Sequence, residues 1–325
     1  MIIESTGTPI LYLGFTLLVI VLLAVDFFVL KAQGAHRVSV KEAAAWSMVW
    51  IVFSLAFCSW FWWYLDGRFG RELANEKALE YLSGYFIEKS LAVDNVFVWI
   101  TLFNFFAVPT EFQKRVLLYG VLGAIVMRAV LIYVGALLLA QFHWILYVFG
   151  LFLLLTGVKM LVFAKHEPDL EKNPILHWMR GHMKITNEYH GESFVLKEGA
   201  RYATPMFLVL VLVEVTDLIF AVDSIPAIFA ITGDPFLVFT SNVFAILGLR
   251  SLYFALGGML DRFRYLKVAL AVVLMVVGVK MLIVKWLKAM LGSGFNFYLL
   301  GVVLLILGAG VALSLIAERR DGRAA

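Results

Sequence analysis

The sequence has little charge and a single cysteine, and each shortage excludes a class of protein. Charged residues make up 15% of the 325 positions, whereas soluble domains contain about 25%. Because Cys58 is the one cysteine, no disulfide forms within the chain. The sequence instead has a hydrophobic content of 62% and a mean hydropathy of +0.92. It therefore predicts an integral membrane protein whose partner is the lipid bilayer, and it carries no nucleic-acid-binding signature.

Nine apolar stretches are long enough to cross the hydrocarbon core, which takes about 20 helical residues. They predict one all-α membrane domain over 1–325, with two N-terminal spans in 1–79 and a ninth span and tail in 287–325. The connection 165–203 is long and polar, and a small hairpin is predicted near 193–199. The nine predicted spans are 9–30, 42–65, 80–104, 116–139, 144–164, 204–231, 237–258, 266–286 and 296–317.

Lysine and arginine are unevenly divided between alternate connections. Most of the loop cations fall in 165–203, in the connections on the same side, and in the C-terminal tail. Because cytoplasmic loops carry the excess of these residues, the N-terminus is predicted outside and the C-terminus in the cytoplasm.

Spans three to five and six to eight carry the same signals in the same order. A helix with acids comes first, then a helix with an arginine, then a helix ending in Gly-Val-Lys-Met-Leu at 157–161 and 278–282. Three spans are an odd number, so the second unit enters the membrane from the opposite side. The sequence thus predicts an inverted 3+3 helix repeat, 80–164 and 204–286, whose site lies near the midplane between the halves.

Each unit opens with two acids six positions apart. Residues 88–95 read Glu-Lys-Ser-Leu-Ala-Val-Asp-Asn, and 217–224 read Asp-Leu-Ile-Phe-Ala-Val-Asp-Ser. An ionised carboxylate near the membrane centre costs about 2.5–3.5 kcal/mol, so these acids need a cation to face. Residues seven apart share a helix face. We therefore expect Glu88 to align with Asn95, and Asp217 with Ser224.

Acids six apart differ by about 120° around a helix, so one helix holds an ion with both only if it unwinds. Pro226 predicts such a break, because it clashes with the carbonyl of Val222 and frees that oxygen. Glu214 shares a face with Asp217 and is interpreted as a ligand, a proton acceptor or the partner of Arg250. The predicted metal ligands are Glu88, Asp94, Asn95, Glu214, Asp217, Asp223 and Ser224.

Asp26 is interpreted as an accessory group or a helix contact. Five cations inside the spans are predicted as supporting counter-ions. Each either packs as a salt bridge, positions a carboxylate, or substitutes for the ion when the site is empty. They are Lys89, Arg128, Lys159, Arg250 and Lys280.

The predicted ligands offer carboxylate, amide, hydroxyl and carbonyl oxygens. Such hard ligands suit Mg²⁺, Ca²⁺ and Mn²⁺, whereas Zn²⁺ usually takes histidine or cysteine. Histidines occur instead in the long loop, where they either bind a metal or belong to a solvated, amphipathic segment. These are His166, His177, His182 and His190.

Residues 88–95 resemble the first signature of the TerC family of bacterial integral membrane proteins, and 213–229 resemble its second. The segment 239–250, Phe-Thr-Ser-Asn-Val-Phe-Ala-Ile-Leu-Gly-Leu-Arg, continues the second. The chain is most similar to the Alx branch of the family. The resemblance implies Mn²⁺ export across the bacterial inner membrane, with Mn²⁺ as the transported ion and no permanently bound cofactor. Older descriptions of the family are tellurium resistance protein and membrane-bound redox modulator.

Other classes stay open at this point. A membrane sensor or scaffold would bind metal without moving it. A redox modulator is disfavoured, because one cysteine and no deep histidine leave neither a disulfide pair nor a bis-histidine haem site. An intramembrane aspartyl protease is disfavoured because neither Asp94 nor Asp223 lies in a Tyr-Asp or Gly-x-Gly-Asp context, so we expect no enzyme. Proton-coupled and uncoupled carriers both fit, since crowded carboxylates favour protonation once the ion has left.

Overall fold

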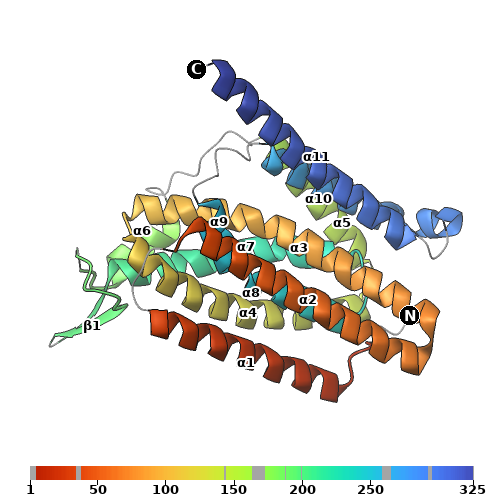
Figure 1. The fold of residues 1–325 in the computed structure, drawn as a ribbon, viewed down its shortest axis with the longest axis horizontal. Helices are drawn as coiled ribbons and strands as arrows, with labels where there is room; N and C mark the ends of the chain where they lie inside the picture. The colour runs from red at the N-terminus through yellow and green to blue at the C-terminus, as the bar shows by residue number, and fades with distance from the viewer. Residues whose placement is uncertain are drawn as a thin grey trace.

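Long apolar helices make up most of the chain and lie side by side in a bundle (Figure 1). The computed structural model describes residues 5–33, 38–142, 144–162, 173–186, 188–198, 200–257, 265–291 and 295–324. The longer helices are α1 (Pro9–Gln33), α2 (Val40–Phe69), α3 (Arg71–Phe105), α4 (Thr110–Gln141), α5 (Ile145–Val162), α7 (Pro205–Phe229), α8 (Pro235–Leu247), α10 (Leu266–Leu291) and α11 (Phe295–Ala324).

Eight stretches of the described residues are long and apolar enough to cross a membrane, against nine predicted. The missing one, 80–104, lies in α3, where Glu88, Lys89 and Asp94 lower the hydropathy. Its 35 residues extend about 50 Å at 1.5 Å per residue, and it packs against α2, α7, α8 and α9. The predicted span 237–258 is two helices, because the chain breaks at Gly248 between α8 and α9 (Leu249–Leu256).

The long loop has structure of its own. It contains the short helix α6 (Pro174–His182) and the predicted hairpin, in which β1 (Val195–Glu198) pairs antiparallel with β2 (Ala200–Ala203). Leu176 and Met179 of α6 are buried in the core beside α7. Tyr189 holds the loop against the α3–α4 turn by donating its hydroxyl to the carbonyl of Phe106 at 2.7 Å. Residues 165–172, with His166, lie outside the described residues.

Helix α8 lies at the centre of the molecule and is almost wholly buried. Its aromatic side chains pack with those of α1 and α2, as where Phe244 contacts Phe15 and Phe57. Asp234 caps its first turn by accepting from the Phe236 amide at 2.9 Å. The same carboxylate accepts from the amide of Thr6 at 2.8 Å, so it ties the start of the chain to this helix.

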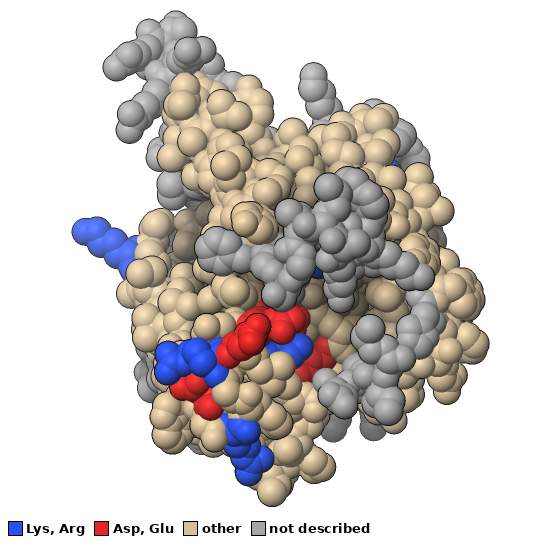
Figure 2. Space-filling view, turned by 90° about the vertical axis from the view of Figure 1, so that its right-hand side faces the viewer, with Lys and Arg blue, Asp and Glu red and all other residues tan. Residues whose placement is uncertain are grey.

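Figure 2 views the end where α2 meets α3 and shows acidic and basic side chains gathered there. Gly70, with φ +89°, makes the turn between the two helices, in a conformation that glycine adopts without strain. Arg71 pairs with Asp66 at 2.9 Å, and Lys77 with Glu80 at 2.8 Å. Burial alone would lower the pKa of Lys77, but the hydrogen-bonded Glu80 carboxylate raises it above its usual value.

The helices that carry the two Gly-Val-Lys-Met-Leu motifs, α5 and α10, pack closely against each other. Glycines make this possible. A Cβ on Gly278 would lie 2.8 Å from the Gly150 carbonyl oxygen, and one on Gly157 would lie 2.8 Å from the Ala271 carbonyl oxygen. The two backbones therefore touch where a side chain would hold them apart.

We predict that Gly278→Ala forces α5 and α10 apart and lowers the free energy of unfolding by about 1–3 kcal/mol, the usual cost of overpacking. Thermal unfolding of the purified protein in detergent measures this. The matched control is Gly301→Ala on α11, where a Cβ meets nothing within 4 Å. Equal stability of the two variants would contradict the close contact.

Candidate functional site

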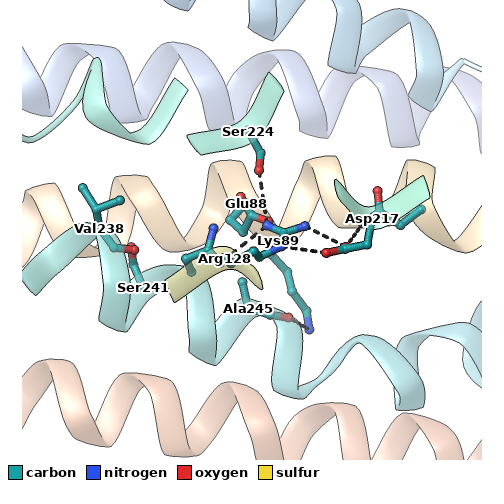
Figure 3. Close-up of polar contacts among 10 residues, drawn as sticks. Glu88, Lys89, Arg128, Asp217, Ser224, Val238, Ser241 and Ala245 are labelled. Carbon is teal, nitrogen blue, oxygen red and sulfur yellow. Dashed lines mark hydrogen bonds and ion pairs between the residues drawn. The ribbon is translucent and has the colours of Figure 1, made fainter. Parts of the chain in front are cut away.

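Arg128 of α4 lies between acids of the two predicted repeat units (Figure 3). Its Nη1 donates to Glu88 of α3, while Nε and Nη2 donate to the two carboxylate oxygens of Asp217 of α7 at 3.1 and 2.9 Å. Nη1 also lies 3.2 Å from Ser224 Oγ and 3.5 Å from Asn242 Oδ1 of α8. Each of these residues is at most 2% exposed. One guanidinium therefore joins four helices in a buried polar cluster.

The two acid motifs contact each other across this cluster, as their spacing predicts. Asn95, seven residues after Glu88, donates to Asp217 at 3.1 Å. Ser224, seven residues after Asp217, faces Arg128 and interacts with Glu88. Because Asn95 meets Asp217 while Glu88 meets Ser224, α3 and α7 cross in antiparallel directions. We call Glu88, Asn95, Arg128, Asp217, Ser224 and Asn242 the Arg128 cluster.

The predicted break at Pro226 is wrong. Helix α7 runs continuously from Pro205 to Phe229 with Pro226 inside it. Pro226 lies in the last turn, so its missing amide removes one hydrogen bond near the helix end instead of opening the middle. Asp217 and Asp223 therefore point in directions about 120° apart around α7. The same holds for Glu88 and Asp94 on α3.

A cavity of about 320 Å³ lies beside the Arg128 cluster, among α3, α5, α7 and α10. The second acid of each motif, Asp94 or Asp223, lines it. Glu88, Asn95, Arg128 and Ser224 form the wall shared with the cluster. The polar lining comprises Glu88, Asp94, Asn95, Arg128, Thr156, Lys159, Asp223, Ser224 and Lys267. Asp94 and Asp223 therefore line the cavity without binding Arg128, Asp217 binds Arg128 outside the cavity lining, and Glu88 does both.

Each cavity acid has its own polar surroundings. Asp223 accepts a hydrogen bond from Thr156 of α5 at 3.3 Å and interacts electrostatically with Lys159. Asp94 interacts electrostatically with Lys267, near the start of α10. Asp94 and Asp223 also act on each other as like charges. The cavity therefore combines carboxylate and hydroxyl oxygens with the charges of two lysines.

Two of the predicted counter-ions bind the C-terminal ends of neighbouring helices. Lys89 donates to the carbonyl of Ala245, in the last turn of α8, at 3.2 Å (Figure 3). Lys280 donates to the carbonyl of Ala230, at the end of α7, at 2.6 Å. The last carbonyls of a helix lack partners within it and carry the negative end of its dipole, so a cation there is stabilising.

Arg250 does not occupy a position like that of Arg128. It donates to Asp26 of α1 at 2.5 Å, and both residues are less than 10% exposed. Asp26 is therefore the partner of Arg250, so the interpretation of Glu214 as that partner is wrong, while its interpretations as a ligand or a proton acceptor stay predictions. The reason is the break at Gly248, which places Arg250 on α9 instead of a continued α8.

Glu214 lies apart from the cavity lining. Its carboxylate fills the space that a side chain on Gly123 of α4 would occupy. Its Oε2 is buried and has no hydrogen-bond partner, although Asp217 acts on it as a like charge.

The loop histidines do not form a metal centre in the described part of the chain. His177, His182 and His190 are exposed, and His182 stacks on Trp178 with ring centroids 5.1 Å apart. No group of three or more histidine, cysteine or acidic side chains among the described residues is arranged to hold a metal. The structure favours the solvated, amphipathic interpretation for these three residues.

Sequence reasoning missed three polar residues of the site. Asn242 lies in the signature segment 239–250 but has no charge to attract notice. Thr156 immediately precedes the first Gly-Val-Lys-Met-Leu motif, where the second has Val277, and this difference was the available signal. Lys267 closely follows the polar segment 261–264, so in the sequence it resembles a solvated loop cation.

The sequence model of the family described as "Integral membrane protein TerC family" matches residues 73–322, which include both acid motifs. The chain belongs to the TerC family. No solved structure matches this TerC protein.

Curated relatives cover nearly all of this TerC protein. A protein of Salmonella typhi is 52% identical over 93% of this chain and 95% of its own length, and one of Escherichia coli K12 is 55% identical over 87% and 88%. Both carry the name "Putative membrane-bound redox modulator Alx". A membrane protein of Myxococcus xanthus is 43% identical over 97% of this chain and 95% of its own. Multi-pass bacterial membrane proteins are therefore its close homologues.

We predict that Asp217→Asn destabilises this TerC protein far more than Glu214→Gln. The first change removes the carboxylate that accepts two hydrogen bonds from Arg128 inside the buried cluster, and a hydrogen bond to a charged group contributes about 1.5–3 kcal/mol. The second removes a carboxylate with an unpartnered oxygen on the same helix. Unfolding of both variants in one detergent measures the difference, and equal losses would show that Arg128 does not depend on Asp217.

Proposed function

We propose that this protein is a carrier, not an enzyme, that exports Mn²⁺ from the cytoplasm across the bacterial inner membrane. The observation that supports it best is the cavity between α3, α5, α7 and α10. Carboxylate, amide and hydroxyl oxygens line it inside a membrane bundle, and such oxygens prefer hard divalent cations. The choice of Mn²⁺ among them rests on the family resemblance.

The ion would enter at the cavity acids, Asp94 and Asp223, and reach Glu88 on the shared wall. Asn95 and Ser224 supply neutral oxygens there. Few carboxylates meet at one point, so the ion would keep part of its water shell, as small hard cations do at sites with one or two carboxylates.

The placement of the cavity lysines supports loading from the cytoplasm. Lys159 lies three residues before the end of α5, and Lys267 lies at the start of α10. The charge distribution of the loops assigns these helix ends to the cytoplasmic side. We propose accordingly that the N-terminus is periplasmic and the C-terminus cytoplasmic. Arg37, Lys165, Lys172, Arg262 and Arg264, which contribute to that assignment, lie outside the described residues.

An inverted repeat fits the helix contacts. In such a repeat, α7 is the counterpart of α3 and α8 is the counterpart of α4. A contact between α3 and α8 should therefore be matched by one between α7 and α4, and both contacts are present. It also relates the Asn95–Asp217 hydrogen bond to the contact of Ser224 with Glu88. In transporters of this kind, one half moves against the other around a midplane site.

A redox role, which the names of the relatives suggest, has less support. Cys58 is 7% exposed, and its sulfur lies 3.9 Å from the Ala78 carbonyl oxygen. Without a second cysteine in the sequence, a thiol–disulfide exchange would need a partner protein.

We predict that proteoliposomes containing the protein move Mn²⁺, detected by a Mn²⁺-responsive dye. Asp94→Asn and Asp223→Asn are each expected to reduce this movement by at least about tenfold, a loss that even outer partners of a metal site cause. The control is Asp66→Asn, which changes an acid outside the cavity in the more exposed Asp66–Arg71 pair and should retain transport. A pH gradient that changes the wild-type rate would identify proton coupling.

Metal binding without movement by the wild type would identify a sensor or scaffold instead. Full transport by both cavity variants would refute the assignment of Asp94 and Asp223.

A further inference from the structure

Two buried carboxylates in the Arg128 cluster share one guanidinium. Glu88, Asp217 and Arg128 are each 1% exposed, so water does not solvate or screen these charges. One positive charge against two negative charges leaves a surplus of one negative charge. A divalent cation would balance the two carboxylates fully.

The guanidinium also leaves polar atoms of the cluster unsatisfied. Glu88 Oε2, Asn95 Oδ1 and Asn242 Nδ2 are buried without a hydrogen-bond partner. Native proteins satisfy most such atoms, and exceptions need a cause, such as a missing ion. Two of the three are oxygens, the kind of atom that a hard cation binds.

Arg128 and Glu88 line the cavity as well as the cluster. A cation that arrives in the cavity therefore meets the carboxylate that Arg128 already holds. We propose that Arg128 is a tethered competitor of the transported ion. Its guanidinium occupies the Glu88–Asp217 pair when no ion is bound, and it is displaced when a divalent cation binds. This inference rests on the proposed transport function.

The competition has a mechanical consequence. Arg128 belongs to α4, whereas Glu88 and Asp217 belong to α3 and α7. With the guanidinium in place, the three helices are tied together. With an ion in its place, α4 loses this link while α3 and α7 keep theirs through the ion. Binding of the ion would thereby release α4 to move relative to α3 and α7.

Arg250 provides a natural comparison, because it is the equivalent arginine of the second repeat unit. It pairs with Asp26 and is not among the residues that line the cavity. The inference therefore applies to one arginine of the pair, and replacing the other is the matched control.

The test is Mn²⁺ binding to purified protein in detergent, measured by calorimetry for the wild type, Arg128→Gln and Arg250→Gln. A competitor that occupies the site about 90% of the time weakens the apparent affinity about tenfold. Arg128→Gln is therefore expected to bind Mn²⁺ at least about tenfold more tightly than the wild type, and Arg250→Gln to match the wild type within about twofold. Unchanged or weaker binding by folded Arg128→Gln would overturn the inference.

A wild type that binds Mn²⁺ but does not transport it would refute the proposed function and leave the competition measurable. A wild type that neither binds nor transports would refute both.

If Arg128→Gln does not fold, the wild type supplies the test. Labelling with phenylglyoxal and peptide mass spectrometry reports how accessible each arginine is. Mn²⁺ is expected to increase the labelling of Arg128 and to leave that of Arg250 unchanged. Labelling of Arg128 that stays constant or falls on adding Mn²⁺ would overturn the inference.

Discussion

The bundle depends on one set of buried ion pairs, in which the guanidinium of Arg128 holds the carboxylates of Glu88 and Asp217. Isolated carboxylates at this depth would cost several kcal/mol each. The acid helices α3 and α7 can cross inside the membrane because α4 brings a cation to the crossing. A single side chain thus permits the packing of three long helices, and it also determines which acids stay free to face the cavity.

The first and the second acid of each motif have different roles. The first acids, Glu88 and Asp217, hold the helices together, while the second acids, Asp94 and Asp223, line open space. Because residues six apart on an unbroken helix point about 120° apart, one motif can serve both purposes. The two copies of the motif in this chain therefore supply one pair of carboxylates that binds Arg128 and one pair that does not.

Much of this arrangement follows from the sequence, and the rest depends on contacts between distant residues. Helix periodicity is sufficient to predict that Asn95 shares a face with Glu88 and Ser224 with Asp217, because those relations lie within single helices. The pairing of Asp26 with Arg250 and of Arg128 with both motifs depends on how helices pack, which spacing does not encode. Pro226 was misread because the effect of a proline depends on how much helix follows it. Lys267 was missed because a cation beside a polar loop resembles any solvated charge.

The close approach of α5 and α10 has a consequence for how such a protein moves. Gly150 and Gly278 bring the two backbones into contact, and side chains such as that of Met281 fill the space around them, so neither position has room for a larger residue. We therefore expect the two helices to behave as one rigid element. That element carries Thr156, Lys159 and Lys267 on the cavity wall, so these three side chains should keep their positions relative to one another.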